Sequence, residues 1–183
     1  MHGVRAMAAS PRFDLDSIEG KSSVLGGIYA ALGHDVRTGT FEDRLRTQRE
    51  VYMMRLHPEL EPYLPFKFTM YVRGPYSPDL AKAYYSAAEP ARVDLAGPAA
   101  DYAREILGTD ARVLEAMATL VKICGLNAGN PGFTARDGLR VLVGIRPPLR
   151  GVAAGALDAL VGLGEKHGLR LPGPCARGAG PGR

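Results

Sequence analysis

The sequence has few of the side chains from which metal sites are built, with only two cysteines and four histidines. No two of the histidines stand three or four positions apart, the spacing of zinc ligands on one helix face. They are His2, His34, His57 and His167. Two distant cysteines also exclude a sulfur-rich site. The sequence therefore predicts no metal and no other cofactor.

The two cysteines lie in different surroundings. Cys124 ends the apolar run of residues 117–124 and is predicted to be a buried, unreactive thiol. Cys175 lies in a segment rich in glycine and proline. A disulfide between them stays open as an alternative, although two cysteines do not make a disulfide framework.

Long hydrophobic runs are absent as well. No stretch reaches the roughly eighteen apolar residues of a membrane-spanning helix, and the best candidate, residues 151–164, is shorter and contains Asp158. Residues 1–12 carry charge but lack the apolar region of a secretory signal. We therefore predict a cytoplasmic protein without a membrane partner.

Catalytic motifs are also lacking. No Gly-x-Ser-x-Gly element is present to hold a nucleophilic serine. The glycine-bearing segment 125–132 is followed by Phe-Thr-Ala, without the lysine and hydroxyl residue of a phosphate-binding loop, and is predicted to be a turn between helices. The sequence predicts a protein that is not an enzyme.

The positive charge lies mostly near the two ends of the sequence. The formal net charge is +4, but Arg5, Arg12, Arg170, Arg177 and Arg183 stand in end segments without acids, so the rest of the chain has a net charge of −1. Nucleic-acid sites concentrate positive charge on one folded face. Nucleic acid is therefore the less favoured partner.

Length and composition predict one domain. With 183 residues, of which 46% are hydrophobic, residues 13–171 can form a single globular domain around one core. Residues 1–12 lack periodicity and are predicted to be a flexible extension. Residues 172–183 are rich in glycine and proline and are predicted to be a flexible tail without a packed element.

The most informative segment present is a strand, a turn and a capped helix. Residues 66–72 alternate apolar and polar side chains as in a half-buried strand, and Gly74-Pro75 is predicted to end it. Ser77 can cap a following helix, with Pro78 at its first position. The pattern predicts a helix over residues 78–88.

Helical periodicity accounts for most of the remaining sequence. The second helix begins after Thr40, and its core face is predicted to carry Phe41, Leu45, Gln48, Tyr52 and Leu56. Further helices are predicted over residues 17–32, 99–107, 110–126, 134–145 and 149–167. The fold class is therefore mostly α, a single helical domain with a short β element. A winged-helix-like arrangement is an alternative.

Two blocks of this sequence resemble the prokaryotic Panacea-type (SocA-like antitoxin) and YwgA-like proteins. That family shows Arg-Leu-x-x-Gln-Lys-x-x-Tyr on a helix, then a Tyr-x-Phe strand, then Gly-Pro-Tyr-Ser-x-x-Leu. The matching positions are Arg44, Leu45, Gln48, Tyr52, Gly74, Pro75, Tyr76, Ser77 and Leu80. Arg49 stands where the family has lysine, and Phe66 replaces the first tyrosine of the strand.

The resemblance implies a helical, non-catalytic domain that binds a partner protein, either a toxin or a client. We predict that the partner-binding residues are Arg44, Gln48, Tyr52, Arg73, Gly74, Pro75, Tyr76, Ser77 and Leu80. For Gln48 a second interpretation stays open, in which its side chain hydrogen-bonds the backbone near the turn. The alternative function is a winged-helix DNA-binding regulator. It would use the arginines of the second helix, because residues 78–88 carry few groups that suit phosphates or bases.

Overall fold

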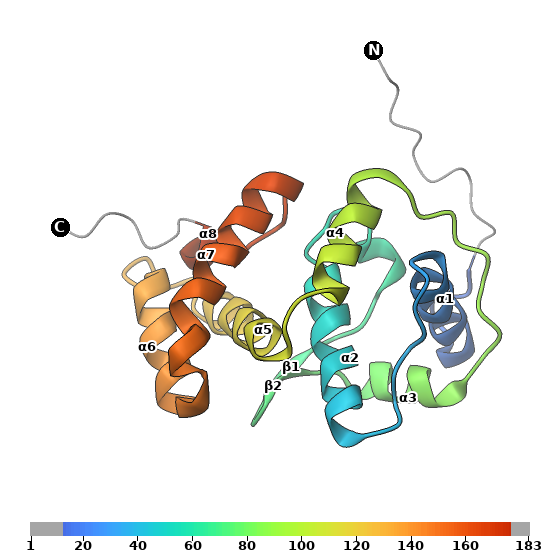
Figure 1. Cartoon of the computed structure of the whole chain (residues 1–183), viewed down its shortest axis with the longest axis horizontal. Coiled ribbons are helices and arrows are strands. Elements are labelled where there is room, and N and C mark those ends of the chain that lie inside the picture. Colours follow the sequence, from blue (N-terminus) through green and yellow to red (C-terminus); the bar gives the residue numbers. More distant parts are fainter. Residues whose placement is uncertain (1–12, 177–183) are drawn as a thin grey trace, which may run out of the picture.

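The structure is a computed structural model and describes residues 13–176. These residues form eight α-helices, two short 3-10 helices and one two-stranded sheet (Figure 1). In chain order the elements are α1 (Ile18–Ala31), α2 (Phe41–Met54), η1 (Glu61–Tyr63), β1 (Thr69–Tyr71), β2 (Gly74–Tyr76), α3 (Pro78–Ser86), α4 (Gly97–Leu107), α5 (Ala111–Leu126), α6 (Ala135–Ile145), η2 (Pro147–Leu149), α7 (Arg150–His167) and α8 (Gly173–Ala176). The predicted fold, mostly α with a short β element, is confirmed.

Helices α2 and α3 begin at the capping residues that the sequence predicted. At α2, Thr40 Oγ1 accepts a hydrogen bond from the Asp43 N–H, and the Asp43 carboxylate accepts one from the Thr40 N–H. At α3, Ser77 Oγ accepts a hydrogen bond from the Leu80 N–H. Because each cap satisfies N–H groups that the first helical turn leaves free, these predicted starts are confirmed.

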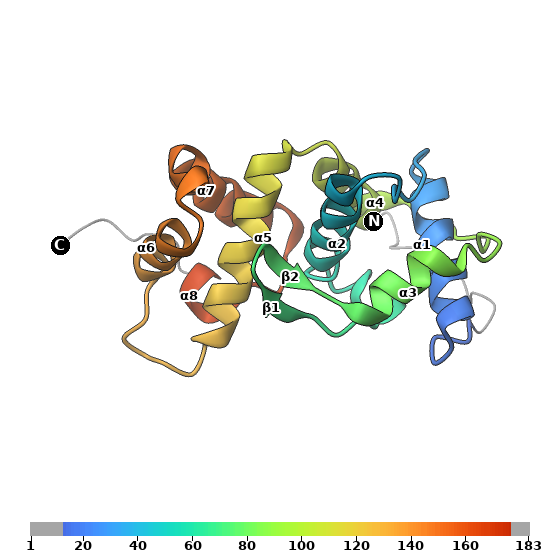
Figure 2. The same cartoon turned by 90° about the horizontal axis from the view of Figure 1, so that it is seen from below.

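Helix α5 is the centre of the fold. Figures 1 and 2 show it between α2 and the hairpin on one side and α6, α7 and α8 on the other. Ten of its 16 residues are buried, and eight of these, between Leu114 and Cys124, are apolar. A helix that contacts neighbours all round must bury side chains on every face, which explains why α5 has no wide polar face.

The β element is a hairpin, whereas the sequence predicted a single strand over residues 66–72. β1 and β2 pair antiparallel, with Tyr71 opposite Gly74 and Met70 opposite Pro75. The prediction that Gly74-Pro75 ends the β structure is therefore wrong. A two-stranded sheet has only edge strands, in which a proline can be accommodated.

The predicted alternation of side chains is correct at the start of this segment and fails at its end. Phe66 and Phe68 are buried, although both precede the first paired residue. Val72 was assigned to the same buried side, but it is 79% exposed. It lies in the turn between the strands, where the period of two no longer decides which way a side chain points.

The predicted flexible tail is wrong over residues 172–176. These residues contain the short helix α8, in which Pro174 and Cys175 are buried. Cys175 forms a disulfide with Cys124, so Cys124 is not the free thiol that was predicted. A covalent bond can fix a segment whose composition would not pack on its own. The rest of the predicted tail, 177–183, and the predicted extension, 1–12, lie outside the described residues.

Residues 87–96 form no helix or strand and lie along α1 (Figure 1). Ser23 on α1 holds them at two points: its Oγ donates to the Glu89 carbonyl at 2.7 Å, and its carbonyl accepts from the Ala91 N–H at 2.9 Å. A Cβ added to Gly27 would lie 2.3 Å from the Ala91 carbonyl oxygen. Glycine at this position therefore permits the connection to cross α1 closely.

Candidate functional site

The residues of the two family-like blocks meet where α2, the hairpin and α3 join. Gln48 on α2 is 1% exposed, and its side-chain amide contacts the backbone of Ser77 twice. Nε2 donates to the Ser77 carbonyl at 3.0 Å, and Oε1 accepts from the Ser77 N–H at 2.8 Å. Of the two interpretations of Gln48, hydrogen bonding inside the fold is the one that the geometry confirms.

Five of the nine residues predicted to contact a partner are buried. They are Gln48, Gly74, Pro75, Ser77 and Leu80. A buried side chain has no surface to offer, so the prediction that these residues touch a partner is wrong for this structure. Their positions show a structural role instead: Gly74 has φ of +110°, which favours glycine, and a Cβ there would lie 3.1 Å from Thr119 Oγ1.

The other four predicted residues reach the surface to different extents. Tyr52 is half-buried with its ring 5.0 Å from the Phe68 ring, and burial raises its pKa to about 12. Arg44 and Tyr76 are half-buried, and Arg73 is exposed. Arg44, Arg73 and Tyr76 are therefore able to contact a partner, whereas Tyr52 serves mainly as a packing residue.

Exposed apolar and aromatic side chains gather around the tip of the hairpin. Tyr71 is 66% exposed, Val72 79%, and Phe41 at the start of α2 is 53% exposed. We call Phe41, Tyr71, Val72 and Arg73 the hairpin patch. The sequence assigned Phe41 to the core face of α2, which is wrong because the buried residues of this helix are concentrated in its second half.

Several contacts fix the hairpin patch to α2. The guanidinium of Arg73 lies 5.2 Å from the centre of the Phe41 ring and donates to Glu42 at 2.9 Å. The backbone of the turn is also bound to α2, because Nη2 of buried Arg49 donates to the Arg73 carbonyl at 3.2 Å. The side chain and the backbone carbonyl of Arg73 are therefore both tied to α2.

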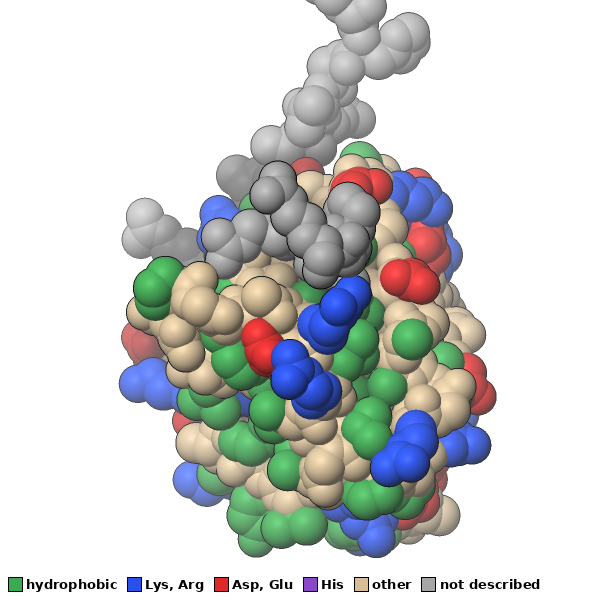
Figure 3. All heavy atoms as spheres, turned by 90° about the vertical axis from the view of Figure 1, so that its left-hand side faces the viewer, with side chains coloured by type: hydrophobic (Ala, Val, Ile, Leu, Met, Phe, Trp, Pro, Cys, Tyr) green, Lys and Arg blue, Asp and Glu red, His purple; other side chains and the backbone are tan. Residues whose placement is uncertain are grey.

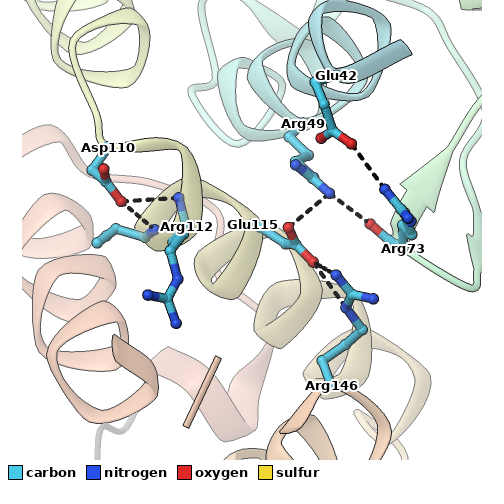
Figure 4. A network of polar contacts seen from close by, with 8 residues as sticks. Glu42, Arg49, Arg73, Asp110, Arg112, Glu115 and Arg146 are labelled. Atoms are coloured by element: carbon cyan, nitrogen blue, oxygen red, sulfur yellow. Dashed lines mark hydrogen bonds and ion pairs between the residues drawn. The ribbon is translucent and has the colours of Figure 1, made fainter. Parts of the chain in front are cut away.

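A buried charge network lies beneath the hairpin patch (Figure 4). Arg49 on α2 contacts Glu115 on α5 at 2.9 Å, and Glu115 accepts from Arg146 at the end of α6 at 2.5 Å. Burial lowers the pKa of Arg49, and the Glu115 carboxylate opposes this shift. No local pattern indicated this network, because its three members are far apart in the chain.

Two adjoining hollows lie between α4 and α7, each of about 510 Å³, and share Glu105 and Lys166. The carboxylate of Glu105 is already paired, because it lies 2.5 Å from the Lys166 ammonium and 3.1 Å from the His167 ring nitrogen. The Lys166 hydrogen bond is the main cause of the lowered pKa of Glu105.

Within residues 13–176 no three His, Cys, Asp or Glu side chains gather as metal ligands. None of the described helices is long and apolar enough to span a membrane.

Comparisons with models of protein families, with curated protein sequences and with solved structures find no match to this chain. The resemblance to Panacea-type and YwgA-like proteins therefore stands on the two sequence blocks. The geometry adds that these blocks meet in one junction, built around the Gln48–Ser77 contact.

Proposed function

We propose that this protein is a non-catalytic interaction domain of the antitoxin-like kind, which binds a partner protein through the hairpin patch. The observation that carries the proposal is the exposure of Tyr71 and Val72 at the hairpin, beside an Arg73 guanidinium that lies over the exposed Phe41 ring. Aromatic and arginine side chains dominate the centres of protein interfaces. The patch combines both with an aliphatic residue.

The fixed geometry of the patch also favours binding. Arg49 holds the hairpin turn through the Arg73 carbonyl, and Glu42 holds the Arg73 side chain. A surface that is ordered before binding loses less conformational entropy when a partner docks. The patch is therefore suited to covering a toxin or holding a client by complementarity of shape.

The buried motif residues have an indirect role in this proposal. Gln48 binds the backbone of Ser77 directly after the hairpin, and Ser77 caps α3. These contacts set where the hairpin leaves α2 and where α3 begins. In our proposal the motif builds a scaffold, and the turn residues between β1 and β2 supply the contact with the partner.

The arginines of α2, which a DNA-binding function would use, are mostly engaged inside the fold. Arg46 donates to the carbonyls of Leu107 and Thr109, and Arg49 pairs with Glu115 inside the protein. Arg55 is half-buried over the Phe68 ring. Arginines that are engaged inside the fold are not free to contact phosphates. The function as a winged-helix regulator therefore stays the second choice.

The test is co-expression with the product of an adjacent short gene, scored by growth rescue and by co-purification. Tyr71→Ser, Val72→Ser and Arg73→Ala should each weaken both readouts, because they remove contact groups at the centre of an interface. Leu126→Ser is the matched control, since Leu126 is equally exposed at 65% but lies at the far end of α5.

Substitutions at Arg44 and Tyr76 provide a second series near the patch, and should weaken rescue by more than any loss of fold stability explains. A change at exposed His34 should do little. The proposal is wrong if no adjacent gene is toxic and no partner co-purifies. The hairpin patch is the wrong surface if all folded patch variants rescue fully.

A further inference from the structure

A second exposed apolar surface lies beside the hairpin, at the end of α6. Val141 is 40% exposed and Ile145 is 54% exposed, one helical turn apart on the same face of α6. Pro147 and Pro148 of η2 are exposed next to them in the chain. We call this surface, with Arg112 and Arg150, the η2 corner.

The η2 corner is rich in arginine. Residues 134–150 contain four arginines and one aspartate, Asp137, which pairs with Arg140 at 2.6 Å. Arg112 reaches the corner from α5, where its guanidinium donates to the Pro148 carbonyl. Arg150 is exposed and has no ion pair with any residue in the described part of the chain. Figure 3 shows Lys and Arg side chains standing among hydrophobic ones on this end of the molecule.

The carboxylates that face this region are already engaged. Glu115 accepts from Arg146 and Arg49, and Asp110 accepts from the N–H groups of Arg112 and Val113 as the cap of α5. Glu42, on the hairpin side, pairs with Arg73. Glu115 and Asp137 offset Arg146 and Arg140, whereas Arg112, Arg136 and Arg150 are exposed and have no ion pair in the described part of the chain.

The η2 corner and the hairpin patch are connected through the buried network. Arg146 directly precedes η2, and it reaches the hairpin turn through Glu115 and Arg49, whose guanidinium donates to Arg73 (Figure 4). Figure 1 shows the start of α7 and the tip of the hairpin on the same side of α5. The two exposed surfaces thus lie on one face of the molecule.

We infer that this face receives one segment of a partner protein, rich in acidic residues and carrying apolar side chains. This inference rests on the proposed function and adds the chemistry of the partner. The apolar residues of the segment cover the hairpin patch and the Val141–Ile145 pair, and its carboxylates meet Arg150 and Arg112. Complementary charge of this kind speeds association and selects among partners.

A protein segment fits this face better than nucleic acid does. Its centre is aliphatic, with Val72, Val141 and Ile145 exposed, and aliphatic side chains offer no stacking surface to bases. An acidic peptide can place its carboxylates on the arginines and its apolar side chains on the exposed aliphatic residues.

The test is selection from a library of random-sequence peptides on the immobilised full-length chain. Enriched peptides should contain Asp and Glu together with Leu, Ile, Val or aromatic residues. Arg150→Glu should weaken their binding about tenfold at low salt, and the binding of this variant should depend less on salt concentration than that of the parent. Arg92→Glu, the same charge change on the connection beside α1, is the control and should leave binding unchanged.

The outcomes separate this inference from the proposed function. Neutral or basic peptides that are weakened only by Tyr71→Ser would overturn the acidic partner and leave the hairpin patch as the binding surface. Acidic peptides weakened by Arg150→Glu but not by Tyr71→Ser would remove the hairpin patch and contradict the proposed function. No enrichment over an unrelated protein, or tighter binding of a single-stranded oligonucleotide than of any selected peptide, would overturn the inference.

Discussion

The phenol of Tyr29 donates a hydrogen bond to Oε2 of Glu50 at 2.8 Å, and both side chains are buried. Arg46 donates to the other carboxylate oxygen at 2.7 Å. Burial raises the pKa of Glu50, and the contacts with Tyr29 and Arg46 reduce this shift without reversing it. The charge on Glu50 is therefore held less favourably in the folded protein than in water.

This arrangement predicts a pH dependence. The folded protein keeps the Glu50 proton to a higher pH than the unfolded chain, so the contribution of Glu50 to stability is full below 4.5 and falls as the pH rises through the raised pKa. Glu50→Gln removes this titration. In urea titrations between about pH 4 and 7, the parent should lose stability relative to the variant as the pH rises. Parallel curves for the two proteins would contradict this account.

The second prediction concerns the buried charge network. Glu115→Ala leaves the guanidinium of Arg49 buried without its carboxylate and should lower the free energy of unfolding by about 3–5 kcal/mol. Asp101→Ala breaks the exposed pair with Arg104 and should cost less than about 1 kcal/mol. Chemical denaturation measures both. Equal losses would show that Glu115 is no more important than a surface charge.

The third prediction concerns Gln48. Gln48→Leu leaves the N–H of buried Ser77 without a partner, while the Ser77 carbonyl still accepts from the Ala81 N–H, and should cost about 1–3 kcal/mol in a denaturant titration. Gln48→Glu keeps an oxygen that accepts from the Ser77 N–H. The second carboxylate oxygen, however, replaces the Nε2 donor and repels the Ser77 carbonyl. A protonated carboxyl can donate there, so the Glu variant should regain stability relative to the parent at low pH, whereas the Leu variant should not.

The fourth prediction concerns the disulfide between Cys124 and Cys175, which are 51 positions apart. Closing a loop of this length is expected to stabilise the fold by about 4 kcal/mol, because it restricts the unfolded chain. The double variant Cys124→Ala and Cys175→Ala should unfold at a lower temperature than the oxidised parent. A dithiol reductant should lower the melting temperature of the parent and leave that of the variant unchanged. A parent that melts at the same temperature in both states would contradict the prediction.

The sequence predicted features that depend on neighbouring residues. Thr40 and Ser77 were recognised as helix caps because a cap acts within three residues of itself. The helices were recognised from a period that extends over one segment. Such signals need no knowledge of which segments pack together, and they sufficed for the fold class.

The candidate site depends on contacts between distant segments, and most of it could not be predicted. Glu115 meets Arg49 only after α5 packs on α2, and nothing near either residue in the chain indicates the pair. The exposure of Phe41 follows from where α2 begins to be covered, so its helical period was misleading. Ser77 was predicted correctly as the cap of α3, but the sequence could not distinguish residues that support the fold from residues that contact a partner.

The crossing of residues 87–96 over α1 bears on the order in which the chain folds. Ser23 and Glu89 are 66 positions apart, and their contact closes a long loop that contains α2, the hairpin and α3. Long-range contacts form late because closing the loop costs chain entropy before the new interactions can compensate for it. We expect α1 to dock after α2 and α3 have met, and to be the first helix released when the protein begins to unfold.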